Sequence, residues 1–350
     1  MNKQMVRLIV MLAMVVAWVL VIRTWTARKQ VDSTRGGLTA GQGGTQMVMG
    51  TFANITAVAE DQETIARSIE AAYAELVAVD DMMSDYKEDS ELSVVNREAF
   101  DRPVQVSEGV FEVLQASVAY SRLSGGAFDV TVGPLVQLWR TMEKEGKKPT
   151  DEQLAQARAS VGYEKLVLNA EERTVRFAVQ GMQLDLGGIA AGYGVDRAIE
   201  AMKAAGAAGG LVDVGGDIRC FGTSPKQTNV WRIGVEDPDG DGDILVVLNL
   251  SDCAIATSGD YRKFAMVDDK RYSHIINPAS GGSASELTSV TVIARTAIET
   301  DALSTAVSVM GQAKGLALIE SIENTEAIVI PAGSPIQFIK TSGAEAYIRK

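Results

Sequence analysis

Hydrophobic and polar positions alternate along this chain with two periods, one near 3.6 residues and one near two, and each period predicts its own kind of element. Residues 62–83 place apolar side chains at the spacing of a long amphipathic helix. The same period predicts helices at residues 107–124, 134–145, 151–159, 188–205, 299–310 and 313–322. Apolar runs interrupted by turn residues predict strands at residues 48–58, 165–169, 173–179, 182–186, 210–215, 231–236, 244–250, 271–277, 288–294, 326–331 and 345–349. Because neighbouring strands are joined mostly by short turns, the pattern favours an α+β fold over a doubly wound parallel sheet.

The N-terminal segment follows neither period. Residues 8–22 contain no charged side chain, and Lys3 and Arg7 precede them. Fifteen residues lie between the core of a signal peptide and a full membrane span, and no convincing cleavage site follows. We therefore expect residues 1–30 to form an uncleaved signal anchor.

The residues after the apolar run set the expected domain boundaries. Five glycines within residues 31–46 predict a flexible tether. Residues 47–350 are then expected to form one folded domain. Basic residues on the far side of the apolar run oppose the positive-inside bias, so charge alone leaves the orientation of the anchor open; they are Arg23, Arg28 and Lys29.

Composition and net charge exclude some classes of function. The net charge is −12 and no basic run occurs beyond the short cluster after the apolar segment, so the chain is not expected to bind nucleic acid. Cys220 and Cys253 lack the spacing of metal ligands. They leave open either one disulfide or two buried free thiols.

Candidate chemistry gathers in two short stretches near the C-terminus. His274 is the only histidine of the chain, and an imidazole titrates near neutral pH. Asp301 and Thr305 stand four residues apart in a segment with helical periodicity, so both oxygens face the same way. Two hard oxygen ligands and one imidazole suggest metal-assisted chemistry on a phosphate-containing substrate.

A glycine-rich segment, DLGGIAAGYGVD at residues 185–196, adds to this picture. Gly187 and Gly188 leave the backbone uncovered where a predicted helix begins, so a carbonyl can approach a cation and the helix N-terminus favours an anionic phosphate. A tight strand-to-helix turn explains the same glycines without a ligand. The cluster DVGGD at residues 213–217 needs no more than a bulge.

An acidic segment, DPDGDGD at residues 237–243, resembles the start of a calcium loop. The twelfth position of that loop is Leu248, where a bidentate Glu is required. We therefore interpret the segment as an acidic hairpin turn.

Eight collinear stretches resemble the FAD:protein FMN transferases, the ApbE family, over nearly all of residues 47–345. They are MGTFANI (49–55), DYKEDSELSVVN (85–96), GGAFDVTVGPL (125–135), DLGGIAAGYGVD (185–196), VDVGGDI (212–218), IATSGDYRKF (255–264), HIINPASGG (274–282) and ETDALSTAVSVMG (299–311). The resemblance implies an α+β fold related to T-fold domains, with antiparallel or mixed sheets and packed helices. It also implies FAD as substrate, bound in a cleft with Mg²⁺ at its diphosphate. Such enzymes move FMN from FAD to a Thr or Ser hydroxyl of an acceptor protein and release AMP.

The resemblance assigns roles to individual residues. Asp301 and Thr305 correspond to side-chain ligands of the metal, and Gly188 to a ligand through its backbone carbonyl. His274 corresponds to the general base for the acceptor hydroxyl. The positions that contact FAD fall on Met49, Tyr86, Ala127, Phe128, Asp129, Asp185, Ala191 and Ile275.

Two positions depart from the family pattern. Ala191 stands where the family usually has Lys, and Asn277 where it commonly has Asp. Loss of the cation at residue 191 would weaken FAD affinity or slow transfer, whereas Asn keeps the turn-forming tendency of Asp. Two rival functions remain. An FAD pyrophosphatase that gives FMN and AMP would use the same metal and cleft with water in place of the hydroxyl, and Ala191 favours a weakly active FAD-binding protein.

The resemblance and the apolar N-terminus together predict a location. Family members act on exported acceptor proteins, and residues 8–22 would hold the chain in a membrane. The expectation is a bacterial inner-membrane protein whose catalytic domain faces the periplasm and flavinylates an exported acceptor.

Overall fold

The structure is a computed structural model of the chain. It describes residues 32–33, 37–226, 228–238, 240, 242–259, 264–267, 270–333 and 337–349. The expected signal anchor lies outside the described residues, as does part of the expected tether.

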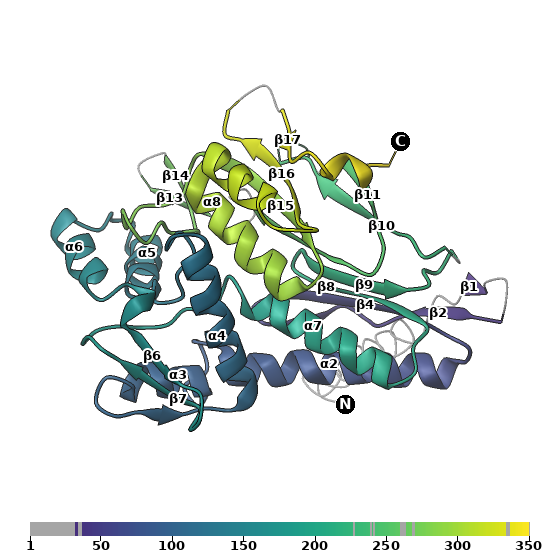
Figure 1. Ribbon diagram of the computed structural model, residues 1–350, viewed down its shortest axis with the longest axis horizontal. Helices are drawn as coiled ribbons and strands as arrows, with labels where there is room; N and C mark the ends of the chain where they lie inside the picture. The colour runs from purple at the N-terminus through teal and green to yellow at the C-terminus, as the bar shows by residue number, and fades with distance from the viewer. Residues whose placement is uncertain are drawn as a thin grey trace, which may run out of the picture.

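One long antiparallel sheet organises the described part of the chain (Figure 1). Its strand order is β1-β2-β4-β8-β9-β12-β15-β16-β17, with β3 paired to β4. The strands are β1 (Asp32–Ser33), β2 (Thr39–Gln42), β3 (Gln46–Val48), β4 (Thr51–Ala59), β8 (Gly209–Val214), β9 (Asp217–Gly222), β12 (Ala254–Gly259), β15 (Leu287–Ala294), β16 (Glu326–Pro331) and β17 (Ile339–Lys340). Every ladder of this sheet is antiparallel, which confirms the expected α+β class with antiparallel sheets.

Three long helices cover one face of this sheet (Figure 1): α2 (Gln62–Met83), α7 (Ala190–Ala204) and α8 (Ala297–Glu320). Ile55 of β4 and Val212 of β8 are buried in the same cluster as Leu76 of α2 and Ile199 of α7. Burying a side chain of this size contributes about 1.5–3 kcal/mol, so these contacts fix the helices on the sheet. Helix α8 has the length and composition of a membrane span, but half of its apolar window is buried, as in the core helix of a globular domain.

The opposite face of the sheet has a thinner cover. It consists of the hairpin β10 (Trp231–Glu236) and β11 (Ile244–Leu250) with the short 3₁₀ helix η2 (Ala344–Ala346). The buried side chains between hairpin and sheet include Trp231, Val235, Leu248, Ile255 and Ile293. Cys220 and Cys253 are buried in this layer as free thiols, so the structure contains no bond between them.

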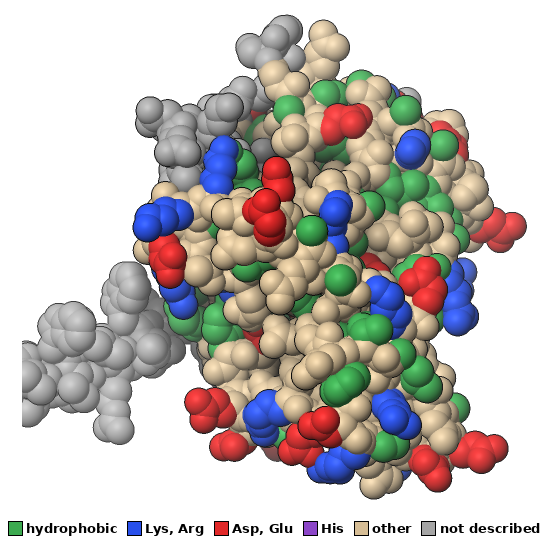
Figure 2. Space-filling model, turned by 90° about the vertical axis from the view of Figure 1, so that its left-hand side faces the viewer, with side chains coloured by type: hydrophobic (Ala, Val, Ile, Leu, Met, Phe, Trp, Pro, Cys, Tyr) green, Lys and Arg blue, Asp and Glu red, His purple; other side chains and the backbone are tan. Residues whose placement is uncertain are grey.

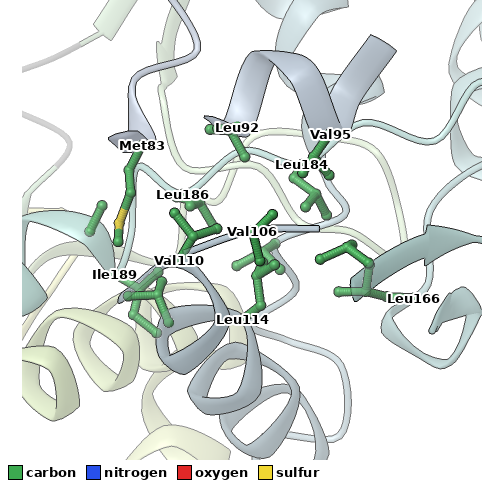
Figure 3. Packing of buried hydrophobic residues seen from close by; sticks show 14 of the residues in the cluster. Met83, Leu92, Val95, Val106, Val110, Leu114, Leu166, Leu184, Leu186 and Ile189 are labelled. Atoms are coloured by element: carbon green, nitrogen blue, oxygen red, sulfur yellow. The ribbon is translucent and has the colours of Figure 1, made fainter. Parts of the chain in front are cut away.

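A second lobe packs beside the helical layer (Figure 1). Its elements are α3 (Glu91–Glu98), β5 (Val104–Gln105), α4 (Glu108–Leu123), α5 (Gly133–Glu145), α6 (Asp151–Ala159), η1 (Tyr163–Lys165), β6 (Leu166–Asn169), β7 (Thr174–Phe177), β13 (Phe264–Val267) and β14 (Lys270–Ser273). Figure 3 shows its core, in which Leu92, Val110 and Leu114 surround Leu186 and Ile189. This core anchors both ends of the glycine turn that precedes α7.

Several expected elements have the predicted bounds, and others do not; the strand expected at residues 48–58, for example, is divided between β3 and β4. Residues 62–83 and 151–159 are helices with the expected ends. Residues 182–186 form no strand; only an isolated bridge joins Gln183 to Val132. Residues 345–349 contain part of η2 and one bridge from Ile348 to Leu248 instead of a strand. The two helices expected after residue 299 are one element, α8, divided where Gly311 has φ 77°.

The expected tether is wrong where the structure describes it. Thr39–Gln42 is β2, paired with β4, so the folded domain begins before residue 47. A Cβ on Gly41 would lie 2.6 Å from Ile65 Cγ2, and one on Gly43 would lie 2.8 Å from Ile69 Cγ2. These glycines permit close packing on α2, and a high glycine content gives the same sequence signal as a flexible linker.

Candidate active site

Two of the three expected metal ligands meet where α7 begins. Gly188 lies in the turn before α7, and a Cβ added to it would be 2.9 Å from Thr305 Oγ1 in α8. The same Cβ would be 3.4 Å from Phe128 Cε2, a buried ring of the second lobe. A side chain at residue 188 would therefore occupy the space beside the Thr305 hydroxyl. Glycine leaves the backbone open to a ligand at this point.

Asp301 lies one helical turn before Thr305, as its spacing predicted. Its carboxylate is 5% exposed, and Oδ2 accepts a hydrogen bond from the backbone N–H of Gly192 at 3.0 Å. Burial raises the pKa of Asp301 to about 7, because a carboxylate is poorly solvated there. A bound cation would favour the ionised form of this group.

A tight joint between α7 and α8 holds these groups in position. A Cβ on Gly192 would lie 2.2 Å from the Ala297 carbonyl oxygen, so the two helix backbones are in direct contact. Asp196 of α7 accepts hydrogen bonds from Ala297 N at 2.8 Å and Ile298 N at 3.0 Å. It thus satisfies the first amides of α8, which Thr296 at the N-cap leaves without a side-chain partner.

The capping role of Asp196 was not predicted from the sequence. Arg219 of β9 forms an ion pair with it, with Nη1 2.9 Å from Asp196 Oδ1. The only sequence signal is its place at the end of the glycine-rich motif.

A second group of contacts surrounds Arg140, which the sequence analysis also missed. Its Nη2 lies 3.1 Å from Asp185 Oδ2, and its Nη1 bonds the Asp85 carboxylate. Its guanidinium carbon lies 4.7 Å from the centroid of the Tyr86 ring. Asp185 also accepts from Gly187 N at 2.9 Å. Tyr86 is 77% exposed, so a flat ligand can approach its ring.

The loop at residues 124–133 places Ala127, Phe128 and Asp129 together. Asp129 Oδ1 accepts from the backbone N–H and the hydroxyl of Thr131, and Oδ2 accepts from Tyr163 N at 2.9 Å. Burial raises its pKa, and these hydrogen bonds oppose that rise. Both oxygens are thus engaged with protein donors, so Asp129 fastens this loop. Phe128 is buried beside Gly188.

His274 follows β14 and is exposed, whereas Ile275 is buried. The loop after it is fixed by Asn277, whose Oδ1 accepts from Ala279 N at 2.9 Å and Ser280 N at 3.1 Å. Trp139 of α5 donates its indole N–H to Gly281 O at 2.8 Å. Asn277 therefore forms a turn of the kind that an Asp side chain also forms.

Met49 packs beside α7, and Ala191 lies in the first turn of that helix. Met49 has φ 52°, at the tip of the β3–β4 hairpin, and its Sδ lies 3.3 Å from the position of a Cβ on Gly194. Ala191 is half-buried against the core of α2, α7 and the sheet. The expected site residues thus form three contact groups, which lie around Thr305, Asp301 and Arg140. Met49 packs beside α7, and His274 lies on a separate loop.

The donor set fits a hard divalent cation only together with a substrate. Within the described residues, no cluster of three His, Cys, Asp or Glu side chains could hold a metal. One carboxylate, one hydroxyl and one backbone carbonyl remain at the α7–α8 joint. Mg²⁺ prefers six oxygen ligands and commonly takes some from substrate phosphates, so these three leave room for a diphosphate.

The fold and these contact groups define a class of protein: an α+β domain with a cluster of oxygen donors where α7 begins, next to the aromatic and acidic side chains around Arg140. The model of the ApbE family matches residues 49–329. The chain therefore belongs to the ApbE family, which confirms the resemblance found in the sequence.

Similar proteins match most of the chain. An FAD:protein FMN transferase of Vibrio cholerae is 34% identical over 310 residues, covering 86% of this chain and 91% of that protein. One from Haemophilus influenzae is 36% identical, covering 74% of this chain and 78% of its own. Among solved structures, the ApbE protein of Thermotoga maritima has a TM-score of 0.80 at 30% identity and covers 87% of this chain and 98% of its own. The flavin transferase ApbE of Vibrio cholerae has a TM-score of 0.78 at 33% identity, covering 88% and 99%.

Proposed function

We propose that this chain transfers FMN from FAD to a Thr or Ser hydroxyl of an acceptor protein and releases AMP. The enzyme class, FAD:protein FMN transferase, rests on relatives of that name at 34% and 36% identity. The observation in this chain that carries the proposal is the contact of Gly188 with Thr305 beside the buried Asp301. That corner has oxygen donors for a cation and the N-terminus of α7, which favours an anionic diphosphate.

Asp301, Thr305 and the Gly188 carbonyl would hold Mg²⁺ together with the FAD diphosphate. When bound, the cation supplies positive charge against the charge that develops as the phosphoanhydride bond breaks. Asp301 is kept in place by the Gly192 N–H, and α8 is kept in register by Asp196. These residues hold the diphosphate still, which lowers the entropic part of the barrier.

The second lobe would bind the rest of FAD. Tyr86 offers an exposed ring backed by Arg140, and Asp185 offers carboxylate oxygens that can accept from ring or ribose donors. Phe128 and Ala127 would border the cleft beside Gly188, with Met49 on the α7 side and Ile275 next to His274. The loops around these residues are fastened by hydrogen bonds, which favours a largely preformed site.

His274 would take the proton of the acceptor hydroxyl. The hydroxyl oxygen forms a bond to the FMN phosphorus, the phosphoanhydride bond to AMP breaks, and AMP leaves with the electron pair. The exposed position of His274 supports this role, because the acceptor is a protein that must approach from solvent.

We further propose that residues 8–22 anchor the chain in the inner membrane of a bacterium, with the domain in the periplasm. The uncharged run and the family's action on exported acceptors support this. The test is an alkaline phosphatase fusion after residue 36, before β2 begins. An active reporter is expected, and an inactive one would contradict a periplasmic domain.

One assay separates the transferase from its two rivals. The full chain in detergent is incubated with FAD, Mg²⁺ and a Thr-containing flavoprotein domain in its apo form. Covalent flavin on the domain, with one AMP per flavin, is expected. Free FMN with AMP would instead identify a pyrophosphatase, and unchanged FAD would identify a binding protein.

A further inference from the structure

Arg140 of α5 connects three segments that lie far apart in the chain. Its Nη1 donates to the Asp85 carboxylate, and its Nη2 lies 3.1 Å from Asp185 Oδ2. The same guanidinium lies over the Tyr86 ring, with Cζ 4.7 Å from the ring centroid. One side chain therefore joins the loop between α2 and α3, the helix α5 and the turn before α7.

These contacts are largely withdrawn from solvent. Figure 2 shows Lys, Arg, Asp and Glu side chains mixed over the end of the molecule that carries α5 and α6, and ion pairs on such a surface contribute little to stability. The Arg140 side chain, by contrast, is only 27% exposed, and those of Asp85 and Asp185 are 18% and 15% exposed. Because the planar guanidinium must satisfy two carboxylates at once, its orientation is fixed.

The two carboxylates lead to the two ends of the proposed FAD site. Asp85 directly precedes Tyr86, whose exposed ring is the proposed surface for the flavin. Asp185 lies in the turn that contains Gly188, the proposed ligand of the cation through its backbone carbonyl. Arg140 thus ties the ring surface to the turn that would hold the diphosphate.

The charge of Arg140 acts on the same contacts. Burial raises the pKa of Asp185, and the Gly187 N–H and the Arg140 guanidinium oppose that rise, whereas the nearby Asp85 carboxylate adds to it. Without the guanidinium, two carboxylates would repel each other and would also repel the anionic diphosphate of FAD. The guanidinium therefore allows both carboxylates to stay ionised beside an anionic substrate.

We propose that Arg140 is a positioning residue for FAD, which holds the Tyr86 ring and the turn at Asp185 at the separation that the flavin ring and the diphosphate of one FAD molecule require. It acts through these two residues and does not touch the reacting atoms. The guanidinium covers one face of the Tyr86 ring, and the flavin stacks on the other, exposed face. This inference rests on the FAD site of the proposed function.

Arg140→Met tests the proposal, because it removes the guanidinium and keeps an unbranched side chain. The full chain in detergent is titrated with FAD and, separately, with ADP, which has the diphosphate but no flavin, each with Mg²⁺. Affinity for FAD should fall at least about 10-fold. Affinity for ADP should stay within about 2-fold, since the Gly187 N–H still holds Asp185. The fluorescence of bound flavin, which a stacked tyrosine quenches, should rise.

Arg176→Met is the matched control, because Arg176 is an exposed arginine of β7 in the same lobe. It should leave both affinities and the fluorescence unchanged. An unchanged FAD affinity in Arg140→Met, an equal loss for FAD and ADP, or an unchanged fluorescence would overturn the proposal.

Two further variants show whether Arg140 acts through its geometry. In a Tyr86→Leu background, Arg140→Met should cost at most about 3-fold in FAD affinity, because the two residues act as a unit; additive losses would contradict this. Arg140→Lys keeps the charge and carries the test if Arg140→Met does not fold. An ammonium lacks the planar fork, so Arg140→Lys should still bind FAD several-fold more weakly than the parent. Full recovery by Lys would show that charge alone matters and would refute positioning.

Transfer of FMN to an acceptor domain is measured in the same preparations, so that the two proposals fail separately. If the parent transfers FMN and Arg140→Met binds FAD as the parent does, the positioning role alone is refuted. If Arg140→Met loses FAD affinity as expected but the parent transfers no FMN, the proposed function alone is refuted.

Discussion

The two halves of the proposed chemistry are built in different ways. The oxygen donors proposed to hold the cation, Asp301 and Thr305, lie at a joint of two helix backbones, where Gly192 admits no side chain and Asp196 caps α8 across the interface. His274 lies on a loop whose fixed points are the Asn277 turn and one indole N–H from α5. The first is buried and held by close backbone contact, and the second is exposed to solvent.

This difference follows from what each half must do. A diphosphate and a cation require oxygen atoms in fixed positions before the substrate arrives, so a backbone joint is suitable. A general base must approach the hydroxyl that it deprotonates, and here this hydroxyl belongs to another protein, the acceptor. We therefore expect a side chain at the backbone contact of Gly192 to destroy both fold and chemistry, and changes at His274 to slow transfer alone.

Gly192→Ala should have the largest effect. Its Cβ would lie 2.2 Å from the Ala297 carbonyl oxygen, and neither backbone can move without separating α7 from α8. We expect the free energy of unfolding to fall by about 3 kcal/mol and transfer to be lost. Denaturation with urea measures the first and covalent flavin the second. Gly44→Ala is the matched control, because a Cβ there meets nothing within 4 Å. Equal stability of the two variants would contradict the tight joint.

Asp301→Asn should abolish transfer while the fold remains. The amide oxygen can still accept from Gly192 N, but the negative charge is gone. We expect a loss on the order of 10³-fold in transfer rate, with a smaller loss of FAD affinity, because the cation acts mainly as the bond breaks. A chelator should bring the parent protein to the same low rate and leave the variant unchanged. Full activity at ordinary Mg²⁺ would remove Asp301 from the metal site; Glu299→Gln, in the same helix, is the charge-matched control.

His274→Ala should slow transfer by about 10²–10⁴-fold with FAD and Mg²⁺ affinity nearly unchanged. No second histidine exists in the chain to replace it. Single-turnover transfer measures the effect, and Asn277→Asp serves as control because an Asp side chain forms the same turn. If transfer stays within a few-fold of the parent, the carboxylates of the cleft become the candidates for the base.

The local parts of this structure could be predicted from the sequence, and the long-range parts could not. The spacing of Asp301 and Thr305 is a property of one helix, so periodicity was enough to place both oxygens together. Arg140 and Asp196 act through partners 45 and 101 residues away, and no local pattern records such contacts. Strand β12 was missed because Ala254–Gly259 is made mainly of small residues, although it lies between β9 and β15.

Residues 182–186 have the alternating burial of a strand but do not form one. Met182, Leu184 and Leu186 alternate as buried positions, as in a half-buried strand. The backbone there bonds to a side chain, since Leu184 N donates to Asn96 Oδ1 at 2.7 Å, and to a loop, since Asp185 N donates to Val130 O at 2.8 Å. Alternation reports which side chains are buried; the hydrogen-bond partners that define a strand come from elsewhere in the chain.

The pH dependence of the unfolding free energy tests how strongly burial affects the Asp301 carboxyl. Its pKa is raised by burial to about 7 in the folded protein, so the folded state holds this proton more tightly than the unfolded chain. The contribution to stability is complete below about pH 4 and is lost as the pH rises through about 7. Between pH 5 and pH 8, metal-free parent protein should therefore lose about 3 kcal/mol more than Asp301→Asn. Urea unfolding in a chelator measures the difference; parallel pH curves would show that burial does not perturb this carboxyl.

Ala191→Lys should have the smallest effect. It tests whether a positive charge at the start of α7 contributes to FAD binding. Ala191 lies in the first turn of α7, near Gly188, where a cation would face the anionic diphosphate. The residue is only half-buried, so solvent weakens the attraction and a long side chain loses freedom when it is fixed. We expect FAD affinity to rise by no more than about 5-fold, with the unfolding free energy nearly unchanged. Isothermal titration with FAD, compared with Ala191→Met as a neutral side chain of similar length, measures it. If Met raises the affinity as much as Lys does, the gain comes from packing, and the positive charge of the lysine that the family usually has at this position would play no role in this chain.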